Sequence, residues 1–455
     1  MSSKLKNPDF KNRGQSPDIE MLKERIAGVL SLARQFGASD AEASTSASAG
    51  LSVTVRMREV ETLEYHRDQG LALTVYFGQR KGSASSSDLS DAAVEESVRR
   101  ACGLAQYAAE DDCSGLADAD RLAKSIPELD LYHPWSIGPV EAIDFATECE
   151  AAALDSDARI SNSEGATVST SAGCRAYGNT RGFLEGYSDS HHSLSCAVLA
   201  EQDGQMESDY EYSVARDAAD LTSAVAIGRE AARRTLQRLG SSKLETQSAP
   251  VLFPARLARG LFGHLVAAVS GGSQYRKATF LLDRLDTQVL ADFISIDEIP
   301  HIPKALGSAA FDNEGVATRD RRLVDGGVLK GYVLGSYYAR KLGMQTTGNA
   351  GGIHNLTVSN TGQSFEVLLA EMDRGFVVCE LMGSGINAVT GDYSRGAAGY
   401  WVENGEMQFP VSEITIAGNL LEMYKNIVAV GTDTELRGTI RTGSVLLEEM
   451  TLAGN

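Results

Sequence analysis

The segments LSVTVRMREVETLEYH (residues 51–66) and GLALTVYFGQRKGSASSS (residues 70–87) place apolar side chains at alternate positions. A period of two is typical of β-strands, and the glycines near these runs suit tight turns. A helix is predicted before the strands, from about residue 18 to 36, because Ile19, Leu22 and Ile26 recur at helical spacing. A second helix is predicted after them, from about residue 91 to 109. This part of the chain therefore indicates a helix–meander–helix unit.

The same order of elements recurs further along the chain. A helix is predicted at about residues 139–153 and another at about 218–239. Three strand-like segments lie between them, at residues 158–180, 182–202 and 204–215. The sequence therefore predicts a second unit of the same kind.

The helices that close the two units have a common feature near their ends. Each contains a pair of arginines, Arg99-Arg100 in the first and Arg233-Arg234 in the second. Positive charge at the end of a helix complements the helix dipole. We predict two copies of one unit, separated near residues 112–137, with a chance similarity of pattern as the alternative.

The chain changes character after residue 245, where glycine becomes dense and strand-like segments dominate. Helices are predicted at about residues 254–270 and 363–371, and the segment 327–342 is predicted to form strands. Many strands at short spacing with glycine turns indicate a barrel or a sandwich.

The predicted fold class is α+β, with an N-terminal α/β region of two helix–meander–helix units followed by a strand-rich, barrel-like C-terminal domain. The expected segments are a flexible arm at residues 1–17, α/β units at 18–111 and 138–239, and the C-terminal domain at 246–455.

Charge and cysteine content restrict the function. The net charge of −19 disfavours direct binding of nucleic acid through a basic patch. The charge is explained either by the need to keep the protein soluble or by an acidic surface that binds a basic partner. The six cysteines form no Cys-x-x-Cys pair, which is typical of a reduced, cytoplasmic protein. No apolar run reaches the roughly 18 residues of a membrane span, and the polar start lacks the apolar core of a secretory signal. We expect a cytoplasmic protein with no membrane contact.

The histidines do not form a recognisable zinc motif. A zincin helix needs His-Glu-x-x-His, and the nearest candidate, GLFGHLVAAVSGGSQ at residues 260–274, has Leu265 after His264. A single histidine on an apolar helix is more often a core residue than a ligand. His191 and His192 lie in a predicted turn or strand edge, where adjacent side chains would point to opposite faces.

Other catalytic patterns are also missing from the sequence. There is no Gly-x-Ser-x-Gly elbow, and Cys379 lies in a predicted core strand. The glycine-rich segment MGSGINAVTGDYSRGAAGYW (residues 382–401) lacks the features of a phosphate-binding loop, so its glycines are expected to permit turns. The residues alone indicate an acidic protein of two or three domains.

Three long strings add a family resemblance. ELMGSGINAVTGDYSRGAAGYWVENGEMQFPVSEITIAGNL (residues 380–420) resembles the hallmark region of the PmbA branch, also called TldE, of the TldD/PmbA family. The strings at residues 311–350 and 441–455 resemble the segment before it and the family's C-terminal end. The resemblance covers nearly the whole chain.

The resemblance implies a zinc metalloprotease built from two related subunits, one TldD-type and one PmbA-type. The TldD-type subunit has a His-Glu-x-x-x-His helix and a downstream cysteine as metal ligands, and the dimer encloses a cavity. The family is linked to maturation of a gyrase-targeting microcin and to breakdown of an antitoxin, hence the older label "modulator of DNA gyrase".

Carried onto this sequence, the metal helix falls on His264, Leu265 and Val269, and the cysteine falls near Arg437-Gly438. Only the first histidine matches. Catalytic zinc takes about three protein ligands, and a leucine side chain cannot act as the general base that activates water. The resemblance therefore implies that this chain binds no cofactor and that zinc lies in the TldD-type partner.

The resemblance also implies an unfolded peptide as substrate, a TldD-type subunit as partner and a homodimer in isolation. Exposed strand edges are expected to bind extended peptide by main-chain hydrogen bonds. The expected lining residues, with barrel turns as the alternative, are Gly383, Gly385, Asn387, Asp392, Tyr393 and Ser394.

Two other functions remain open. An enzyme acting alone would need metal ligands from distant positions such as His191, His192, His354 and Asp392. A non-enzymatic binding protein would use its acidic surface to modulate gyrase or a toxin.

Overall fold

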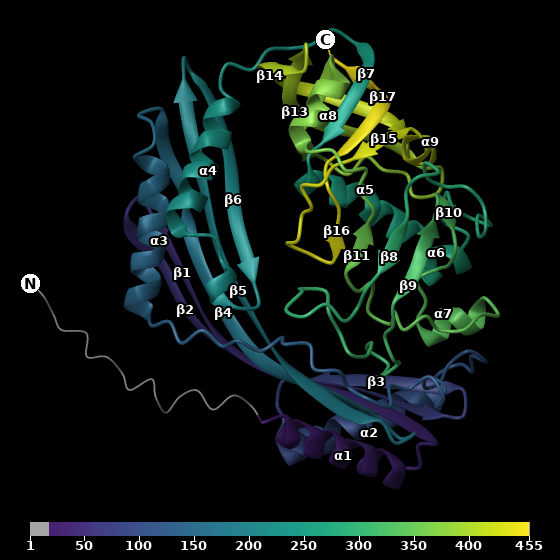
Figure 1. The fold of residues 1–455 in the computed structure, drawn as a ribbon. Coiled ribbons are helices and arrows are strands. Elements are labelled where there is room, and N and C mark those ends of the chain that lie inside the picture. Colours follow the sequence, from purple (N-terminus) through teal and green to yellow (C-terminus); the bar gives the residue numbers. More distant parts are fainter. Residues whose placement is uncertain (1–17, 455) are drawn as a thin grey trace, which may run out of the picture.

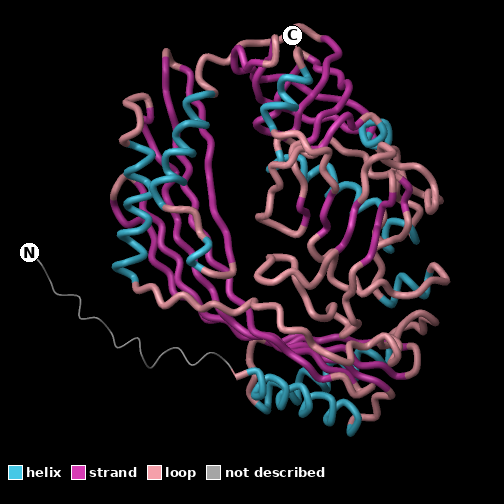
Figure 2. The backbone as a smooth tube through the Cα atoms, viewed as in Figure 1, coloured by secondary structure: helices cyan, strands magenta, loops and turns pink. Residues whose placement is uncertain are grey.

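The computed structural model describes residues 18–454, so the predicted arm at residues 1–17 lies outside the described part. A long antiparallel sheet bends around the C-terminal domain, and most of the helices packed on the sheet lie on the side away from that domain (Figure 1). The sheet has six strands in the order β3-β2-β1-β4-β5-β6. Figure 2 shows the same division, with long strands on one side and short strands joined by many loops on the other.

The N-terminal region contains both predicted helix–meander–helix units. The first consists of α1 (Ile19–Gln35), β1 (Asp40–Arg56), β2 (Glu59–Phe77), β3 (Arg80–Ser86) and α2 (Asp91–Tyr107). The second consists of α3 (Pro139–Leu154), β4 (Ile160–Asn179), β5 (Leu184–Gln202), β6 (Gln205–Ala215), the 3-10 helix η2 (Ala218–Asp220) and α4 (Ala224–Gln237).

Polar caps fix where these helices begin. The Asp18 carboxylate accepts a hydrogen bond from the Glu20 N–H at 3.0 Å, and the Ser90 hydroxyl accepts one from the Ala93 N–H at 3.4 Å. Such caps satisfy N–H groups that have no partner within the helix. They account for the agreement between the predicted and observed starts of α1 and α2.

The two units join through their first strands. β1 pairs with β4 in antiparallel register from Glu42, opposite Asn179, to Val55, opposite Ala166. One half of the sheet packs against α1 and α2, and the other half packs against α3 and α4, in two separate apolar cores. The odd-numbered residues of β1 contribute to these cores, so its even-numbered residues face the C-terminal domain.

The C-terminal domain holds a closed barrel of five strands, β14-β13-β12-β7-β17, closed by pairing of β14 with β17. These strands are β7 (Gln247–Phe253), β12 (Gly375–Met382), β13 (Asp392–Glu403), β14 (Glu406–Asn419) and β17 (Val445–Ala453), with β15 (Ile427–Val430) paired to β17. The predicted α+β fold class with a barrel-like C-terminal domain is therefore confirmed.

A second sheet of five short strands completes the domain in the order β10-β9-β8-β11-β16. They are β8 (Ile296–Glu298), β9 (Arg321–Asp325), β10 (Val328–Leu329), β11 (Leu356–Val358) and β16 (Ile440–Arg441). The helices are α5 (Ala255–Ala268), α6 (Gly271–Tyr275), α7 (Ser336–Lys341), α8 (Phe365–Met372) and α9 (Leu420–Lys425). α5 contacts β7 and β12 of the barrel and β16 of the second sheet, so it lies within one shared core.

Three predictions of local structure were wrong. The helix predicted at 218–239 is divided, because Asp217 caps η2 and Ser223 caps a separate α4. The segment predicted as strands at 327–342 contains only the two-residue β10 and then turns into α7. The predicted turn or strand edge at His191-His192 lies inside β5. The short helices α6, α7 and α9 have too few turns to produce a visible period.

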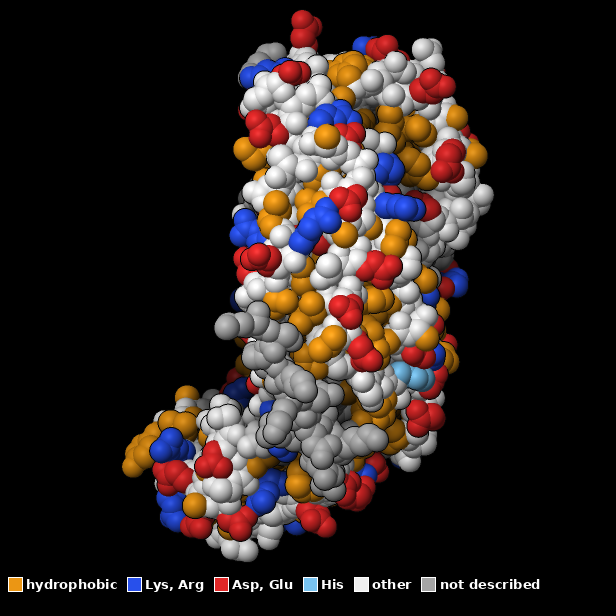
Figure 3. All heavy atoms as spheres, turned by 90° about the vertical axis from the view of Figure 1, so that its left-hand side faces the viewer, with side chains coloured by type: hydrophobic (Ala, Val, Ile, Leu, Met, Phe, Trp, Pro, Cys, Tyr) orange, Lys and Arg blue, Asp and Glu red, His pale blue; other side chains and the backbone are white. Residues whose placement is uncertain are grey.

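The surface mixes charges of both signs. Figure 3 shows the face that bears α3, where acidic and basic side chains alternate with apolar ones. Within residues 18–454, no helix has both the length and the apolar character needed to cross a membrane.

Candidate functional site

Two cavities open between the bent sheet and the C-terminal domain. The first has a volume of about 750 Å³ and lies between β1–β5 and the segment 311–313. The second, of about 730 Å³, lies between β6 and α4 on one side and residues 302–306 and 436–441 on the other. Both volumes are in the range of ligand-binding pockets, about 300–1,000 Å³.

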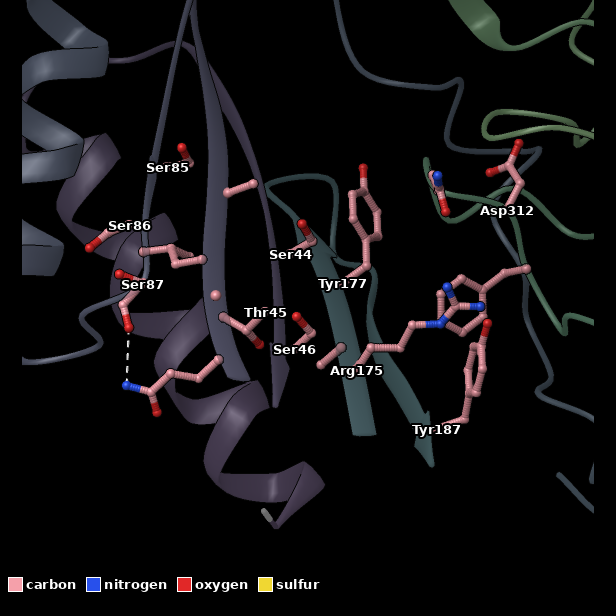
Figure 4. Close-up of a pocket in the computed structure, with 17 residues that line it drawn as sticks. Ser44, Thr45, Ser46, Ser85, Ser86, Ser87, Arg175, Tyr177, Tyr187 and Asp312 are labelled. Atoms are coloured by element: carbon pink, nitrogen blue, oxygen red, sulfur yellow. Dashed lines mark hydrogen bonds between the residues drawn. The ribbon is translucent and has the colours of Figure 1, made fainter. Parts of the chain in front are cut away.

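The concave face of the sheet is polar because small hydroxyl residues occupy alternate strand positions. Ser44 and Ser46 of β1 face the first cavity, while their neighbours Ala43 and Ala47 are buried in the core beneath α1 and α2. Ser85, from the end of β3, also lines the cavity (Figure 4). This surface offers many hydrogen-bonding groups and few charges.

Arg175 is the charged group of β4 in the first cavity. Its guanidinium lies 4.4 Å from the centre of the Tyr187 ring, in cation–π geometry. Figure 4 shows Arg175 reaching from its strand toward Tyr187, with Tyr177 and Asp312 beside it. The neighbouring Tyr177 hydroxyl instead donates to the Glu42 carboxylate at 2.7 Å.

Asp312 closes the first cavity from the C-terminal domain and is only 2% exposed. Burial raises its pKa to about 7, although the N–H groups of Ala350, Glu314 and Val316, each 2.9 Å away, partly oppose this. These three donors use both carboxylate oxygens. The carboxyl group therefore stabilises its own loop.

The wall around Asp312 joins the two parts of the protein. The Phe311 ring packs against Phe183 with centroids 5.1 Å apart and against Tyr187 at 5.6 Å, both edge to face. These rings belong to an apolar cluster formed by the connection at residues 117–131, residues 177–187 around the turn from β4 to β5, and the C-terminal domain. The first cavity therefore lies at a packed contact between the two regions.

Several charged side chains at the second cavity form ion pairs. Arg216 bonds to the Asp189 carboxylate at 2.9 Å and to the Leu306 carbonyl at 3.0 Å, and Lys304 pairs with Asp217 at 2.8 Å. Hydrogen bonds from Lys304 lower the pKa of Asp217. The contacts of Arg216 with Leu306 and of Lys304 with Asp217 cross between the two regions.

Arg437 lies near the position where the family resemblance predicts a cysteine, and the structure places it in an ion network beside the second cavity. Its guanidinium pairs with Glu211 of β6 and with Glu435, at 2.5 Å for the latter. It also lies 4.4 Å from the Tyr212 ring centre. Burial alone would raise the pKa of Glu435, but the hydrogen bonds from Arg437 lower it. This residue therefore joins the two regions electrostatically.

The same arginine blocks part of the free edge of β6. Its Nη1 donates to the Tyr212 carbonyl at 2.6 Å, while the Tyr212 N–H donates to Glu211 at 3.0 Å. The Tyr210 N–H likewise donates to Asp209 at 2.7 Å. Edge groups used in this way do not accept a further strand. The expected binding of peptide to strand edges is therefore disfavoured at this part of β6.

His264 is the residue onto which the resemblance carries the first histidine of the family's metal helix, and its ring lies edge-on to an aromatic side chain. It is half-buried on α5, with its ring centre 6.2 Å from that of Tyr393. Burial, together with the charge of Arg395, lowers the pKa of His264. The imidazole is thus neutral near pH 7.

The other two positions of the metal helix do not fit a zinc ion. Leu265 and Val269 are fully buried in the C-terminal core, and neither aliphatic side chain has an electron pair to donate. Among residues 18–454, no three His, Cys, Asp or Glu side chains gather in a way that could hold a metal. The zinc that the family implies therefore does not fit the residues present here.

The scattered ligands weighed for an enzyme acting alone are separated or already hydrogen-bonded. His192 is buried, with Nδ1 2.8 Å from the Thr170 hydroxyl and Nε2 2.8 Å from the His133 carbonyl, while His191 is exposed on the opposite face of β5. The backbone N–H of His354 donates to Glu298 at 2.6 Å. Asp392 lies in a different place, where the Thr390 hydroxyl and the Asn419 amide lower its pKa.

The glycine-rich segment forms the connection between β12 and β13. The Gly385 carbonyl accepts from the Ser394 N–H at 2.7 Å, and the Asn387 N–H donates to the Asp392 carbonyl at 2.9 Å. Gly383 has a positive φ of 72°, as a tight turn requires. Tyr393 is 2% exposed and is a core residue of the C-terminal domain, unlike the exposed position that a path-lining residue needs.

The other five residues predicted to line a peptide path are Gly383, Gly385, Asn387, Asp392 and Ser394. They are exposed at the surface, and the two cavities have other linings. Their role in a peptide path stays a prediction.

The residues that shape the cavities were mostly missed from the sequence. Arg175 and Asp312 belong to no motif, and Arg437 was noted only as a missing cysteine. The repeated serines and threonines at alternate strand positions were the available signal, because alternation predicts one polar face.

Comparison with known proteins assigns the class. Residues 246–454 match the C-terminal domain of the PmbA/TldA metallopeptidases, residues 132–239 match their central domain, and residues 41–105 match their domain 1. The matches cover most of the chain, which therefore belongs to the PmbA/TldD family of metallopeptidases.

Individual relatives agree over almost the whole length. The chain is 51% identical to Metalloprotease PmbA of Escherichia coli O157:H7 over 96% of each chain. It is 46% identical to a Metalloprotease PmbA homolog of Haemophilus influenzae, over 95% of this chain and 96% of that one. Its fold matches that of a proposed modulator of DNA gyrase from Bacteroides thetaiotaomicron, with a TM-score of 0.91, 28% identity and coverage of 95% and 99%.

Proposed function

We propose that this chain is the PmbA-type subunit of a two-subunit metalloprotease, and that a TldD-type subunit supplies the zinc and the catalytic base. The observation that carries the proposal is the environment of the metal-helix positions. Leu265 and Val269 are sealed in the core, and Arg437 is held by Glu211 and Glu435 where a cysteine ligand would fall. A single neutral imidazole at His264 is too few ligands for a stable zinc site.

The contribution of this chain is to bind and orient an unfolded peptide. The hydroxyl groups of Ser44, Ser46 and Ser85 can donate hydrogen bonds to, and accept them from, the backbone groups of a peptide. Such contacts do not select for one peptide sequence. The packed contact at Phe311 keeps this wall rigid, and a rigid wall reduces the entropy cost of ordering a flexible ligand. In the proposed complex, the peptide is then presented to the active site of the partner.

Reconstitution from separate subunits tests this function. Each subunit is purified alone and then mixed, and cleavage of an unfolded casein-derived peptide is followed with and without a chelator. The chain alone is expected to show no chelator-sensitive cleavage, and the mixture is expected to cleave. Chelator-sensitive cleavage by the chain alone would contradict the proposal.

A pair of matched variants locates the active site. In the mixed enzyme, the cleavage rate with His264→Ala of this chain is expected to stay within about twofold of the wild-type rate, because a single imidazole does not make a zinc site. Alanine at the first histidine of the partner's metal helix is expected to abolish cleavage. Loss of cleavage with His264→Ala in a folded chain would assign catalysis to this subunit.

A further inference from the structure

We infer that the first cavity is a subsite for the carboxylate group of a bound peptide, and that Arg175 is its charged recognition group. The inference rests on the proposed function, because it names the chemical class of peptide group that this subunit selects.

Arg175 is a positive charge without an anionic partner. In the described part of the chain it forms no ion pair, and its ring contact is with Tyr187 at 4.4 Å. Its side chain is exposed on the concave face of β4. In a chain with a net charge of −19, an exposed guanidinium inside a cavity that pairs with no carboxylate is available for a ligand.

The nearby carboxylates are already engaged. Asp189 binds Arg216 at 2.9 Å. Asp312 accepts the N–H groups of Ala350, Glu314 and Val316, each at 2.9 Å. Neither acid forms an ion pair with Arg175 in the described part of the chain, although the charge of Asp189 acts on it at longer range.

The surroundings favour a singly charged ligand with two acceptor oxygens. A guanidinium can donate two parallel hydrogen bonds to a carboxylate. The hydroxyls of Ser44 and Ser46 line the same cavity, and the Tyr187 hydroxyl is buried with no hydrogen-bond partner in the described residues. Buried polar groups are usually paired, so the Tyr187 hydroxyl marks a place where a hydrogen bond remains to be made.

The cavity also disfavours a doubly charged ligand such as a phosphate group. Among its lining residues, Arg175 is the one basic side chain, and the buried Asp312 stands at the opposite wall. A peptide carboxylate has two sources, the C-terminus and the side chains of Asp and Glu. Both sources present the same carboxylate group to Arg175, and the binding experiment distinguishes the C-terminus from an acidic side chain.

The test measures binding to the purified chain alone, by fluorescence anisotropy at low salt. The probes are labelled ten-residue peptides of glycine, serine and alanine in three forms. The first has a free C-terminal carboxylate, the second has a C-terminal amide, and the third has the amide and one central glutamate. Binding of the first alone assigns the C-terminus, binding of the third alone assigns an acidic side chain, and both outcomes support the subsite.

Variants identify the recognition group. Arg175→Gln is expected to weaken binding of the carboxylate peptide by about tenfold or more, because a charge-assisted hydrogen bond is lost. Arg229→Gln is the control, because it removes one exposed charge on α4 outside both cavities. Arg175→Lys keeps the charge and is expected to bind more tightly than Arg175→Gln. Thermal melts confirm that each variant is folded.

The inference is overturned if the wild-type chain binds the amide peptide as well as it binds both carboxylate forms. Equal affinities of Arg175→Gln and Arg229→Gln would also overturn it. Because the assay contains no partner and no cleavage step, its failure is distinguishable from failure of the reconstitution experiment.

Discussion

Arg437 and Glu211 form an ion pair that joins the C-terminal domain to the edge strand of the long sheet. The Glu211 side chain is 7% exposed and is also bound by Arg234 at 2.6 Å. The arginine lies near the position where the family resemblance predicts a cysteine ligand. In this chain, that position therefore stabilises the contact between the two regions.

Loss of this contact should reduce stability. Arg437→Ala is expected to lower the free energy of unfolding by about 2 kcal/mol, because hydrogen bonds to charged groups are worth about that much and Arg234 still neutralises Glu211. Urea denaturation measures the change. Arg322→Ala, which removes an exposed ion pair with Asp297, is the control and should change stability little. Equal effects of the two variants would show that the Arg437 network is not a structural contact.

Restoring a histidine of the family motif should not create a metal site. Val269→His introduces a polar ring into a fully buried position, and a cost of about 2 kcal/mol or more is expected. Ala267→His, on the exposed side of the same region, should fold as the wild type does. Neither variant is expected to bind zinc when metal content is measured. A stable Val269→His protein with bound zinc would refute this description of the helix.

Stability should depend on the protonation of Asp312. Its pKa is raised to about 7 in the folded protein, so the folded state holds a proton that the unfolded chain releases between about pH 4 and 7. The free energy of unfolding is therefore expected to fall as pH rises through this window, by on the order of 4 kcal/mol from this group. Asp312→Asn should remove that part of the slope.

Denaturation of both proteins between pH 5 and 8 checks this expectation. The difference between the two curves isolates Asp312 from the other titrating groups. Asp292→Asn, at an exposed position, is the control and should keep the wild-type slope. A slope unchanged by Asp312→Asn would mean that its carboxyl group is ionised throughout.

The aromatic contact between the regions should be a major source of stability. Phe311→Ala removes edge-to-face contacts with Phe183 and Tyr187, and a loss of about 3–5 kcal/mol is expected for a buried phenylalanine. Phe293→Ala, at a residue that is 44% exposed, should cost much less. Thermal melts compare the two. Similar melting temperatures would show that the C-terminal domain does not depend on this contact.

Local elements of the fold could be predicted well where caps and periodicity agree. α1 and α2 begin where Asp18 and Ser90 supply caps, and the long strands of the meanders follow their alternating patterns. The pairing of β1 with β4 was not predictable, since it joins residues more than a hundred positions apart. Strands of two or three residues, such as β10 and β11, are too short to produce a pattern.

The candidate site was predictable only in part. The mismatch of positions 265 and 269 with the family's metal helix followed from the identities Leu265 and Val269, and the structure places both side chains in the core. The cavity at Arg175 was not predicted, because Ser44, Arg175 and Asp312 come from three distant segments. Tyr393 was assigned to a peptide path because it lies among glycines, but its ring packs near His264 in the core.

The most direct test of the account is the zinc content of the purified chain. The chain is prepared without chelator, dialysed against zinc-containing buffer, passed over a desalting column and analysed by metal mass spectrometry. If the zinc belongs to the partner subunit, we expect no zinc beyond the background of a His264→Ala control, and one zinc per complex once a TldD-type subunit is added. One zinc retained per isolated chain, and lost in the control, would contradict it.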